Sequence, residues 1–258
     1  MSKVEVLVAT INQSDFTLFD KMNIQTDVLI ANQSSTFSKV YTSINNCSVK
    51  MITTDQKGVG KNRNIALMFA ASEICILSDD DVVFKKNYHE IISNAFEQVP
   101  NADILIFNVN MKNDNSYNRI NTKVEKVNLF NFMNYGAVRI AFRREKILRN
   151  NIWFSTKFGG GAEFSSGEDS LFLREALRKK MNIYTIPECI ADVKQDESTW
   201  FTGYNEKYFI DKGRFLAAAF PILKFVLAVH FSIKFSRITQ KNFIKIFKLI
   251  HSGIKDYK

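Results

Sequence analysis

Short apolar runs alternate with helix-like segments along the first half of the chain, and this alternation constrains the fold most. The runs cover residues 4–9, 27–31, 49–53, 74–77 and 104–107. Between most of them, apolar residues recur at helical spacing. Continuous apolar strands joined through helices are typical of a mainly parallel sheet covered on both faces. We therefore expect an α/β fold that binds its ligand outside the carboxyl ends of the strands.

The charge of the chain is concentrated at its C-terminal end. The 258 residues include 35 Lys and Arg against 26 Asp and Glu, a net charge of +9 at pH 7. Residues 207–258 hold 11 of these bases and two of the acids, whereas bases and acids balance in residues 1–206. We therefore expect a neutral body, residues 1–206, and a basic amphipathic helical tail, residues 207–258.

The tail contains an amphipathic pattern. Phe243, Ile246, Phe247 and Ile250 recur at helical spacing, with lysines on the opposite side. Such a helix can lie on a membrane, where each basic residue near an anionic leaflet contributes about 1 kcal/mol. It can equally pack its apolar face on the body, and the charge asymmetry favours the anionic membrane surface. No nucleic-acid partner is expected, because the tail carries no RNA-binding motif.

Cysteine use and hydropathy indicate the compartment. Cys47, Cys75 and Cys189 are widely spaced and form no CxxC motif, which is typical of a reducing environment. The N-terminus lacks a signal-peptide pattern, and Pro221, two lysines and a histidine interrupt the longest apolar stretch, residues 215–235. We expect a cytoplasmic protein, peripheral at the inner face of the cell membrane.

Three consecutive aspartates, Asp79, Asp80 and Asp81, follow the apolar run 74–77. Neighbouring carboxylates repel one another unless a cation or ordered donors compensate them. Magnesium and manganese accept carboxylate and phosphate oxygens as ligands. An acidic turn that caps the next helix is the alternative, but the position at the end of a strand favours a metal–phosphate site.

A glycine-containing turn, Gly58 to Gly60, precedes Lys61 and Arg63 at the start of a helical segment. Glycines let backbone approach a ligand, and the basic residues with the helix N-terminus favour anions. The pattern is neither a Walker loop nor a dinucleotide fingerprint, and a solvated helix start fits it equally well. Its place upstream of the aspartates favours the positive side of a metal–diphosphate site.

Glu168 and Asp169 open a further helical segment after Ser166 and Gly167. Acids there complement the helix dipole and Ser166 can cap the helix, so the pattern alone favours a structural role. The glycine-rich stretch 159–161 just upstream favours a second interpretation, in which a carboxylate at the start of this helix acts as a general base.

These segments together resemble a known family. The run GVGKNRNIALMFAASEICILSDDDVVF and the later FGGGAEFSSGEDSLFLREALRKKMNIYTIPE are similar to family-2 glycosyltransferases of the GT-A fold. VEVLVATINQ and STWFTGYNEKYFIDKGRFLAAAFP resemble a bacterial surface-polysaccharide branch, and the resemblance covers roughly residues 3–221. It implies an inverting, metal-dependent transferase that moves a sugar from a nucleotide-diphosphate donor to a glycan hydroxyl, such as that of a lipid-linked polysaccharide intermediate.

The resemblance also implies roles for single residues. Asp79 and Asp81 would be the DxD pair that binds manganese or magnesium, and Asp169 would be the catalytic base. The residues implied for the donor are Thr10 and Asn12 at the nucleobase, Asn32 in the turn after the second strand, Lys61 and Arg63 at the diphosphate, and Asp79 and Asp80 near the ribose or sugar. Those implied for the acceptor side or a lid are Glu168, Gly160, Gly161, Trp200 and Tyr204.

Two positions depart from the family pattern. Many members carry Asp-Asp-Gly-Ser where this chain has Ala31, Asn32, Gln33 and Ser34, which removes an acid at the nucleotide. Some members place a metal-binding histidine where this chain has Lys194.

Two other classes of function stay open. One is a non-catalytic membrane-binding adaptor with a structural acidic cluster. The weaker one is a phosphotransferase of the haloacid-dehalogenase type, whose DxDxV motif lies on the first strand and not, as here, after several strands.

Overall fold

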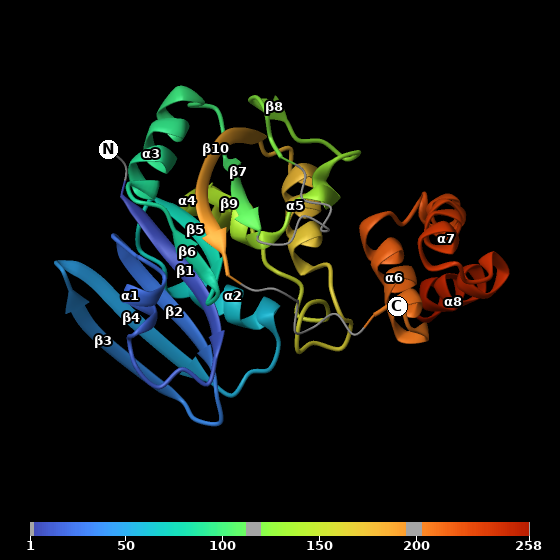
Figure 1. The fold of residues 1–258 in the computed structure, drawn as a ribbon, viewed down its shortest axis with the longest axis horizontal. Coiled ribbons are helices and arrows are strands. Elements are labelled where there is room, and N and C mark those ends of the chain that lie inside the picture. The colour runs from blue at the N-terminus through green and yellow to red at the C-terminus, as the bar shows by residue number, and fades with distance from the viewer. Residues whose placement is uncertain (1–2, 112–119, 195–202, 258) are drawn as a thin grey trace.

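The computed structural model describes residues 3–111, 120–194 and 203–257, and within them a ten-stranded sheet lies between helices (Figure 1). The strands are β1 (Val4–Ile11), β2 (Asp27–Gln33), β3 (Ser38–Ile44), β4 (Cys47–Thr54), β5 (Ile74–Asp79), β6 (Val82–Phe84), β7 (Ile104–Met111), β8 (Glu125–Lys126), β9 (Ile140–Arg143) and β10 (Ile183–Val193). Their order across the sheet is β3-β4-β2-β1-β5-β9-β7-β10-β6, and β8 pairs with β10.

Helices connect these strands and form the C-terminal end of the chain. They are α1 (Leu18–Lys21), α2 (Val59–Phe69), α3 (Tyr88–Gln98), α4 (Arg144–Arg149), α5 (Glu168–Arg178), α6 (Glu206–Ala219), α7 (Lys224–Thr239) and α8 (Phe243–Asp256). Two short 3-10 turns cover Phe132–Asn134 and Ala137–Arg139. The second turn runs directly into β9.

The α/β fold expected from the sequence is confirmed, with a parallel central part and antiparallel additions. β4, β2, β1 and β5 are parallel neighbours, and β7 is parallel to β10. β3, β6, β8 and β9 pair antiparallel, so the sheet as a whole is mixed. The parallel register aligns Thr10 with Asn32 and Ala9 with Asp79, which brings three predicted site segments to one edge.

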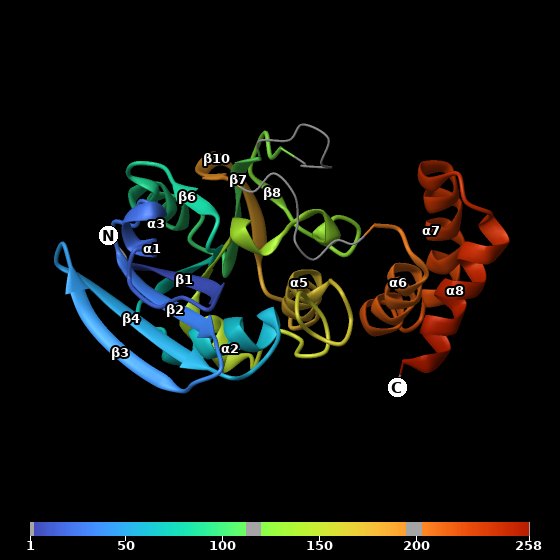
Figure 2. The same cartoon turned by 60° about the horizontal axis from the view of Figure 1, so that its bottom comes forward.

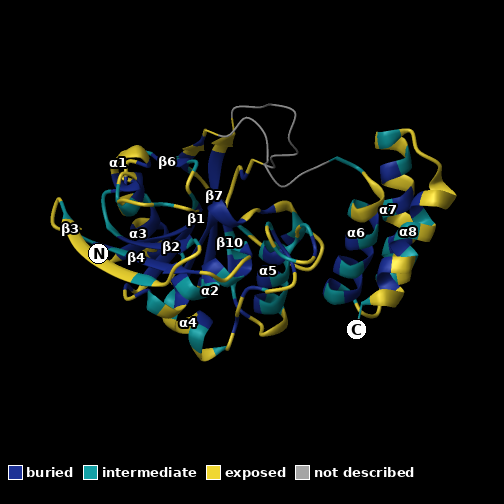
Figure 3. Cartoon of the chain, turned by 90° about the horizontal axis from the view of Figure 1, so that it is seen from below, coloured by how far each residue is buried: buried dark blue, intermediate teal, exposed yellow. Residues whose placement is uncertain are grey.

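The two sides of β1 enter two separate cores, because successive strand residues point to opposite faces. Val6 and Val8 pack with residues of α1 and α3, whereas Leu7 packs with residues of α2, α4 and α5. Figure 3 shows the buried strands between these helical layers. Both faces of the central sheet are therefore covered, as its continuous apolar runs predict.

Helices α6, α7 and α8 form a separate group, in which α6 lies beside α5 and α7 and α8 lie beyond α6 (Figure 2). Two glycines set the close approach of α6 and α8. A Cβ on Gly213 would lie 2.0 Å from the carbonyl oxygen of Ile250, and one on Gly253 would lie 1.9 Å from that of Ile210. The helix backbones therefore touch where only hydrogen occupies the side-chain position.

An aromatic cluster joins this helical group to the body. Phe158 lies 6.4 Å from Phe215 of α6 and 5.9 Å from Tyr257 after α8, measured between ring centroids. Arg214 lies over the ring of Phe164 at 4.8 Å. The C-terminal group is thus packed on the loop that precedes α5, and it contributes to the surroundings of that helix.

The amphipathic pattern in the tail finds an intramolecular partner. Ile246 and Ile250 are buried against α6 in the same apolar cluster as Phe209 and Leu216, and the helix begins at Phe243 after its N-cap Asn242. The apolar face of this helix therefore packs on α6, another helix of the tail, and not on residues 1–206 as the second alternative has it. Within residues 3–111, 120–194 and 203–257, no helix is long and apolar enough to span a bilayer.

Candidate active site

The carboxyl ends of β1, β2 and β5 meet at one edge of the sheet, as the parallel register requires. There the Thr10 hydroxyl donates a hydrogen bond of 2.5 Å to Oδ2 of Asp80. A residue expected at the nucleobase is therefore tied directly to the aspartate cluster.

Asn32 is buried at this edge, and its amide groups are used within the protein. Its Nδ2 donates to the carbonyl oxygen of Gln13 and to Oγ1 of Thr53, and its Oδ1 accepts from the Gln13 backbone N–H. The expected contact of Asn32 with a nucleotide is not favoured by this geometry, and its observed role is to fix the turn after β1. Asn12, by contrast, is exposed in that turn.

Arg63 of α2 connects the two acidic segments of the site. Its Nη2 lies 2.8 Å from Oδ1 of Asp79, and its Nη1 lies 2.6 Å from Oε1 of Glu168. The arginine side chain is 5% exposed and that of Glu168 is 11% exposed. A single buried cation thus joins the end of β5 to the start of α5, segments about 90 residues apart.

The electrostatics of Arg63 follow from these partners. Burial works against its charge, but Asp79 and Glu168 outweigh that effect and hold the pKa of the guanidinium above its usual range. Both ends of the guanidinium are therefore occupied by carboxylates, and its role at a diphosphate stays a prediction. Glu168, expected at the acceptor or sugar, is the buried partner of Arg63, and its contact with a substrate stays a prediction.

The glycine turn before α2 packs against the protein and not against an open ligand site. A Cβ on Gly60 would lie 2.1 Å from the carbonyl oxygen of Ser155. The Val59 N–H donates to the carbonyl oxygen of Gly160, so a first-turn amide of α2 is already used. The close approach that Gly60 permits is with the loop before α5, and an approach of this turn to a ligand stays a prediction. The Lys61 ammonium group donates a hydrogen bond to Oε1 of Gln56 at the exposed side of the turn.

Asp81 differs from its two neighbours because no side chain in the described ranges pairs with its carboxylate. Asp79 is paired with Arg63 and Asp80 with Thr10, whereas no other residue in the described ranges donates a hydrogen bond to the Asp81 side chain. Burial, with repulsion from Asp79 and Asp80, raises the pKa of Asp81 to about 6. The surroundings of this carboxylate therefore provide no positive charge to balance it.

The residues here fit a hard divalent cation. The free oxygens of Asp81 and the remaining oxygen of Asp79 are the ligand type that magnesium and manganese prefer, completed in many sites by phosphate oxygens. The described residues contain no cluster of three His, Cys, Asp or Glu that would bind a metal without such help. Lys194 touches this motif through its backbone, since its N–H donates to the Asp81 carbonyl oxygen.

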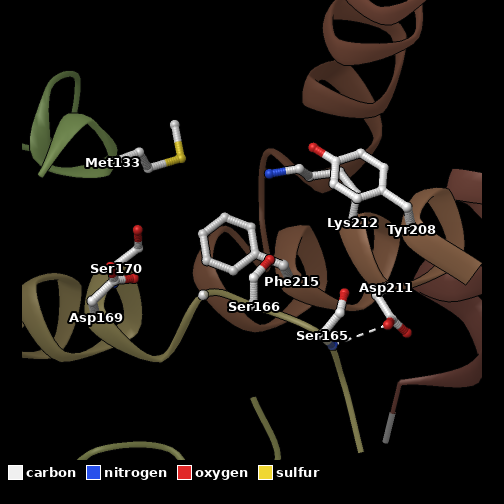
Figure 4. Close-up of a pocket in the computed structure, with 10 residues that line it drawn as sticks. Met133, Ser165, Ser166, Asp169, Ser170, Tyr208, Asp211, Lys212 and Phe215 are labelled. Carbon is white, nitrogen blue, oxygen red and sulfur yellow. Dashed lines mark hydrogen bonds between the residues drawn. The ribbon is translucent and has the colours of Figure 1, made fainter. Parts of the chain in front are cut away.

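Asp169 lies in the first turn of α5 and lines a pocket of about 160 Å³ (Figure 4). Its Oδ1 accepts a hydrogen bond from the Ser170 N–H, and no described residue donates to its second oxygen, Oδ2. Burial, with repulsion from Glu168, raises the pKa of Asp169. A carboxylate with one free oxygen and a raised pKa is suited to accept a proton near neutral pH.

The remaining acceptor-side or lid predictions have different outcomes. The carbonyl oxygen of Gly160 accepts from α2, and Gly161 is exposed with a φ of 76°. The Tyr204 ring packs 5.1 Å from that of Tyr208 and 5.6 Å from that of Phe235, inside the helical group and not beside Asp169. Trp200 lies outside the described residues.

The sequence analysis missed the pocket residues that α6 contributes. Tyr208, Lys212 and Phe215 line the pocket opposite Asp169, together with Met133. Their spacing of four and three residues is the available signal, because it places them on one face of a helix. The amphipathic pattern recognised in the tail is that of residues 243–250, which lie on α8, so it gives no indication of this face of α6.

Replacing Arg63 by Met should lower the free energy of unfolding by about 3 kcal/mol, because it leaves two carboxylates in a site built around one cation. Lys61→Met on the same helix is the control, and it should change stability by less than about 0.5 kcal/mol. Urea unfolding followed by circular dichroism measures both. Equal stability of the Arg63 variant and the wild type would contradict the structural role of this ion-pair network.

Solved glycosyltransferase structures resemble this chain. S. aureus TarS 1-349 in complex with UDP-GlcNAc matches with a TM-score of 0.63 and 18% identity, over 84% of this chain and 66% of that one. S. aureus TarS 1-349 alone matches with a TM-score of 0.61 and 16% identity, over 98% and 91%. The mannosyltransferase PcManGT from Pyrobaculum calidifontis, in complex with GDP-Man and Mn2+, matches with 0.52 and 15%, over 89% and 64%. At these identities the likeness shows the fold.

The sequence comparison gives the family itself. No curated protein matches the sequence. The model of glycosyl transferase family 2 matches residues 23–179, which is more than half of the chain. This chain therefore belongs to glycosyl transferase family 2.

Proposed function

We propose that this protein is an inverting, metal-dependent glycosyltransferase that moves a sugar from a nucleotide-diphosphate donor to a hydroxyl group of a glycan acceptor, such as a lipid-linked intermediate. The observation that carries the proposal is the Arg63 bridge. Arg63 fixes Asp79, which lies close in the chain to the unpaired carboxylate of Asp81. Arg63 also fixes Glu168, which precedes Asp169 and its free oxygen. The proposed nucleotide-sugar site and the proposed base thereby belong to one edge of the sheet.

The chemistry is a single displacement. The acceptor oxygen forms a bond to the anomeric carbon while the bond from that carbon to the diphosphate oxygen breaks, and the electron pair leaves with the diphosphate. Asp169 accepts the proton of the acceptor hydroxyl. Attack from the face opposite the leaving group inverts the anomeric configuration.

Asp81 and Asp79 would hold the divalent metal, manganese or magnesium, together with donor phosphate oxygens. Bound there, the metal would supply positive charge for the leaving diphosphate. Lys61 would add a cation on the same side of the site. A cation held there would offset the burial and the repulsion from Asp79 and Asp80 that raise the pKa of Asp81.

Calorimetric titration with UDP, GDP, dTDP and CDP, with and without manganese, tests the donor site. We expect one nucleotide to bind only when the metal is present, and Asp81→Ala to abolish that binding. Asp55→Asn, which changes an exposed aspartate after β4, is the control and should bind as the wild type does. Failure of all four nucleotides to bind a folded protein would favour the non-catalytic membrane adaptor.

Replacing Asp169 by Asn should keep nucleotide affinity within about threefold of the wild type and lower turnover by about 10²–10⁴-fold, because only the proton acceptor is lost. The wild-type rate should rise with pH over a range above the ordinary aspartate pKa of about 3.9, since the base must be deprotonated. Rates of sugar transfer measured against pH provide the check. A variant that loses donor binding and turnover equally would contradict the role of base.

We further propose that the C-terminal group associates with an anionic membrane surface through α7 and the turn before it, and not through the buried face of α8. Exposed apolar side chains gather there, with Ile222 at 92% and Val226 at 68% exposure, and Phe225, Val229 and Ile233 follow on α7. Lys224, Lys234 and Arg237 lie on the same helix. Apolar side chains beside lysines are typical of interfacial binding.

Sedimentation with vesicles of phosphatidylglycerol and phosphatidylcholine tests this surface. The double variant Val226→Ser, Val229→Ser should bind about thirtyfold more weakly, because each valine loses roughly 1 kcal/mol of apolar transfer energy and every 1.4 kcal/mol is a factor of ten. Phe130→Ser, at a side chain that is 94% exposed on the body, should bind as the wild type does. Equal binding of the double variant and the wild type would refute the α7 surface.

A further inference from the structure

The pocket beside Asp169 has one wall from the body and one from the C-terminal group. Asp169 and Ser170 come from the start of α5, and Tyr208, Lys212 and Phe215 come from α6 (Figure 4). The helical group is therefore part of the site at which the proposed base acts. The ligand of the α6 side chains does not depend on which nucleotide sugar is the donor.

Lys212 projects from α6 towards the α5 side of this pocket (Figure 4). Its ammonium group lies 5.0 Å from the ring centroid of Phe215 and 5.2 Å from that of Phe231. In the part of the chain that the structure describes, no carboxylate, carbonyl or hydroxyl oxygen accepts a hydrogen bond from it. The aromatic faces stabilise the cation but leave its three N–H donors unused.

The acids around the pocket do not neutralise Lys212. Asp211 is already paired with two other cations, Lys207 at 2.6 Å and Arg214 at 2.9 Å, and it accepts the Ser165 N–H. Asp169 favours the charge of Lys212, whereas Lys234 from α7 opposes it. Burial, with the repulsion from Lys234, lowers the pKa of Lys212 to about 8. An anion placed in the pocket would relieve this shortage of negative charge.

The other polar groups of the pocket suit an oxyanion. Ser166 and Ser170 line it with hydroxyl groups, which can donate to phosphate oxygens, and Tyr208 adds a phenol. Hydrogen bonds from an ammonium group to an oxyanion are stronger than those between neutral groups. A volume of about 160 Å³ accommodates one phosphate-sized group with part of a sugar or polyol.

We propose that Lys212, together with the hydroxyl groups of the pocket, binds a phosphate-type anionic group on the acceptor and so positions the acceptor hydroxyl for Asp169. The acceptor class is therefore a phosphorylated glycan or polyol and not a neutral sugar. This inference rests on the proposed function for the role of Asp169, but the binding site itself does not depend on it.

The side chain of Met133 lines the same pocket, so its methyl group reports directly on binding. Protein labelled with ¹³C at the methionine methyl groups is titrated with glycerol 3-phosphate, with inorganic phosphate and with glycerol, and Met133→Leu assigns the signal. We expect both phosphates to shift the Met133 signal saturably, and glycerol to do so at least about tenfold more weakly. Equal effects of glycerol and glycerol 3-phosphate would overturn the proposal.

Variants separate this site from the donor site. Lys212→Gln should weaken phosphate binding at Met133 at least about tenfold, and Lys212→Arg should restore it to within about threefold. Lys248→Gln, which removes an exposed lysine of α8, is the matched control and should leave binding unchanged. Lys61→Gln should leave the Met133 shift unchanged too, whereas loss of that shift would mean that phosphate binds on the donor side and would overturn the proposal.

The proposal of an acceptor site and the proposal of a transferase can be refuted separately. Phosphate binding at Met133 that depends on Lys212, without any nucleotide binding, would support the anion site and reject the transferase. Nucleotide binding with metal, but no phosphate effect at Met133, would reject the phosphorylated acceptor alone.

Discussion

The buried ion pairs of Arg63 are the interaction on which the rest of the site depends. Asp79 ends a strand of the central sheet and Glu168 begins a helix on its face, and the guanidinium lies between them. Because a buried arginine is costly without partners, α2, β5 and α5 must come together for any of them to be stable at these positions. The close packing of Gly60 on Ser155 holds α2 near enough for that contact.

The five carboxylates of the site differ by their surroundings and not by their type. Asp79 and Glu168 are paired with Arg63, and Asp80 accepts from Thr10. Asp81 and Asp169 keep free oxygens, and burial raises the pKa of each. Three of the five acids are thus paired within the protein, and one acid in each motif keeps free oxygens. In the proposed function, these two unpaired acids serve the metal and the proton transfer.

The C-terminal helices form a compact group that contacts the candidate site on one side and carries exposed apolar side chains on another. Their apolar interior is closed by the contact of α6 with α8 at Gly213 and Gly253, and Phe158 joins them to the body. One face of α6 lines the pocket at Asp169, and the outer face of α7 carries the exposed apolar side chains. In the proposed function, a surface for the membrane and a subsite for the acceptor therefore belong to the same helical group.

The sequence alone determined the local elements and the edge at which the site lies. Continuous apolar runs predict central strands, because a strand that is buried on both faces has apolar residues at successive positions. Polar residues that follow residues 4–9, 27–31 and 74–77 predict a site at the carboxyl ends of these strands. It did not reveal β3, whose exposed Val40 and Tyr41 give an edge strand little apolar pattern. Only the tertiary structure decided that Arg63 bonds Glu168 across 105 residues, that α8 buries its apolar face on α6, and that Lys212 faces Asp169. Periodicity shows which side chains share a face, but the partner that covers the face is set by packing between segments distant in the chain.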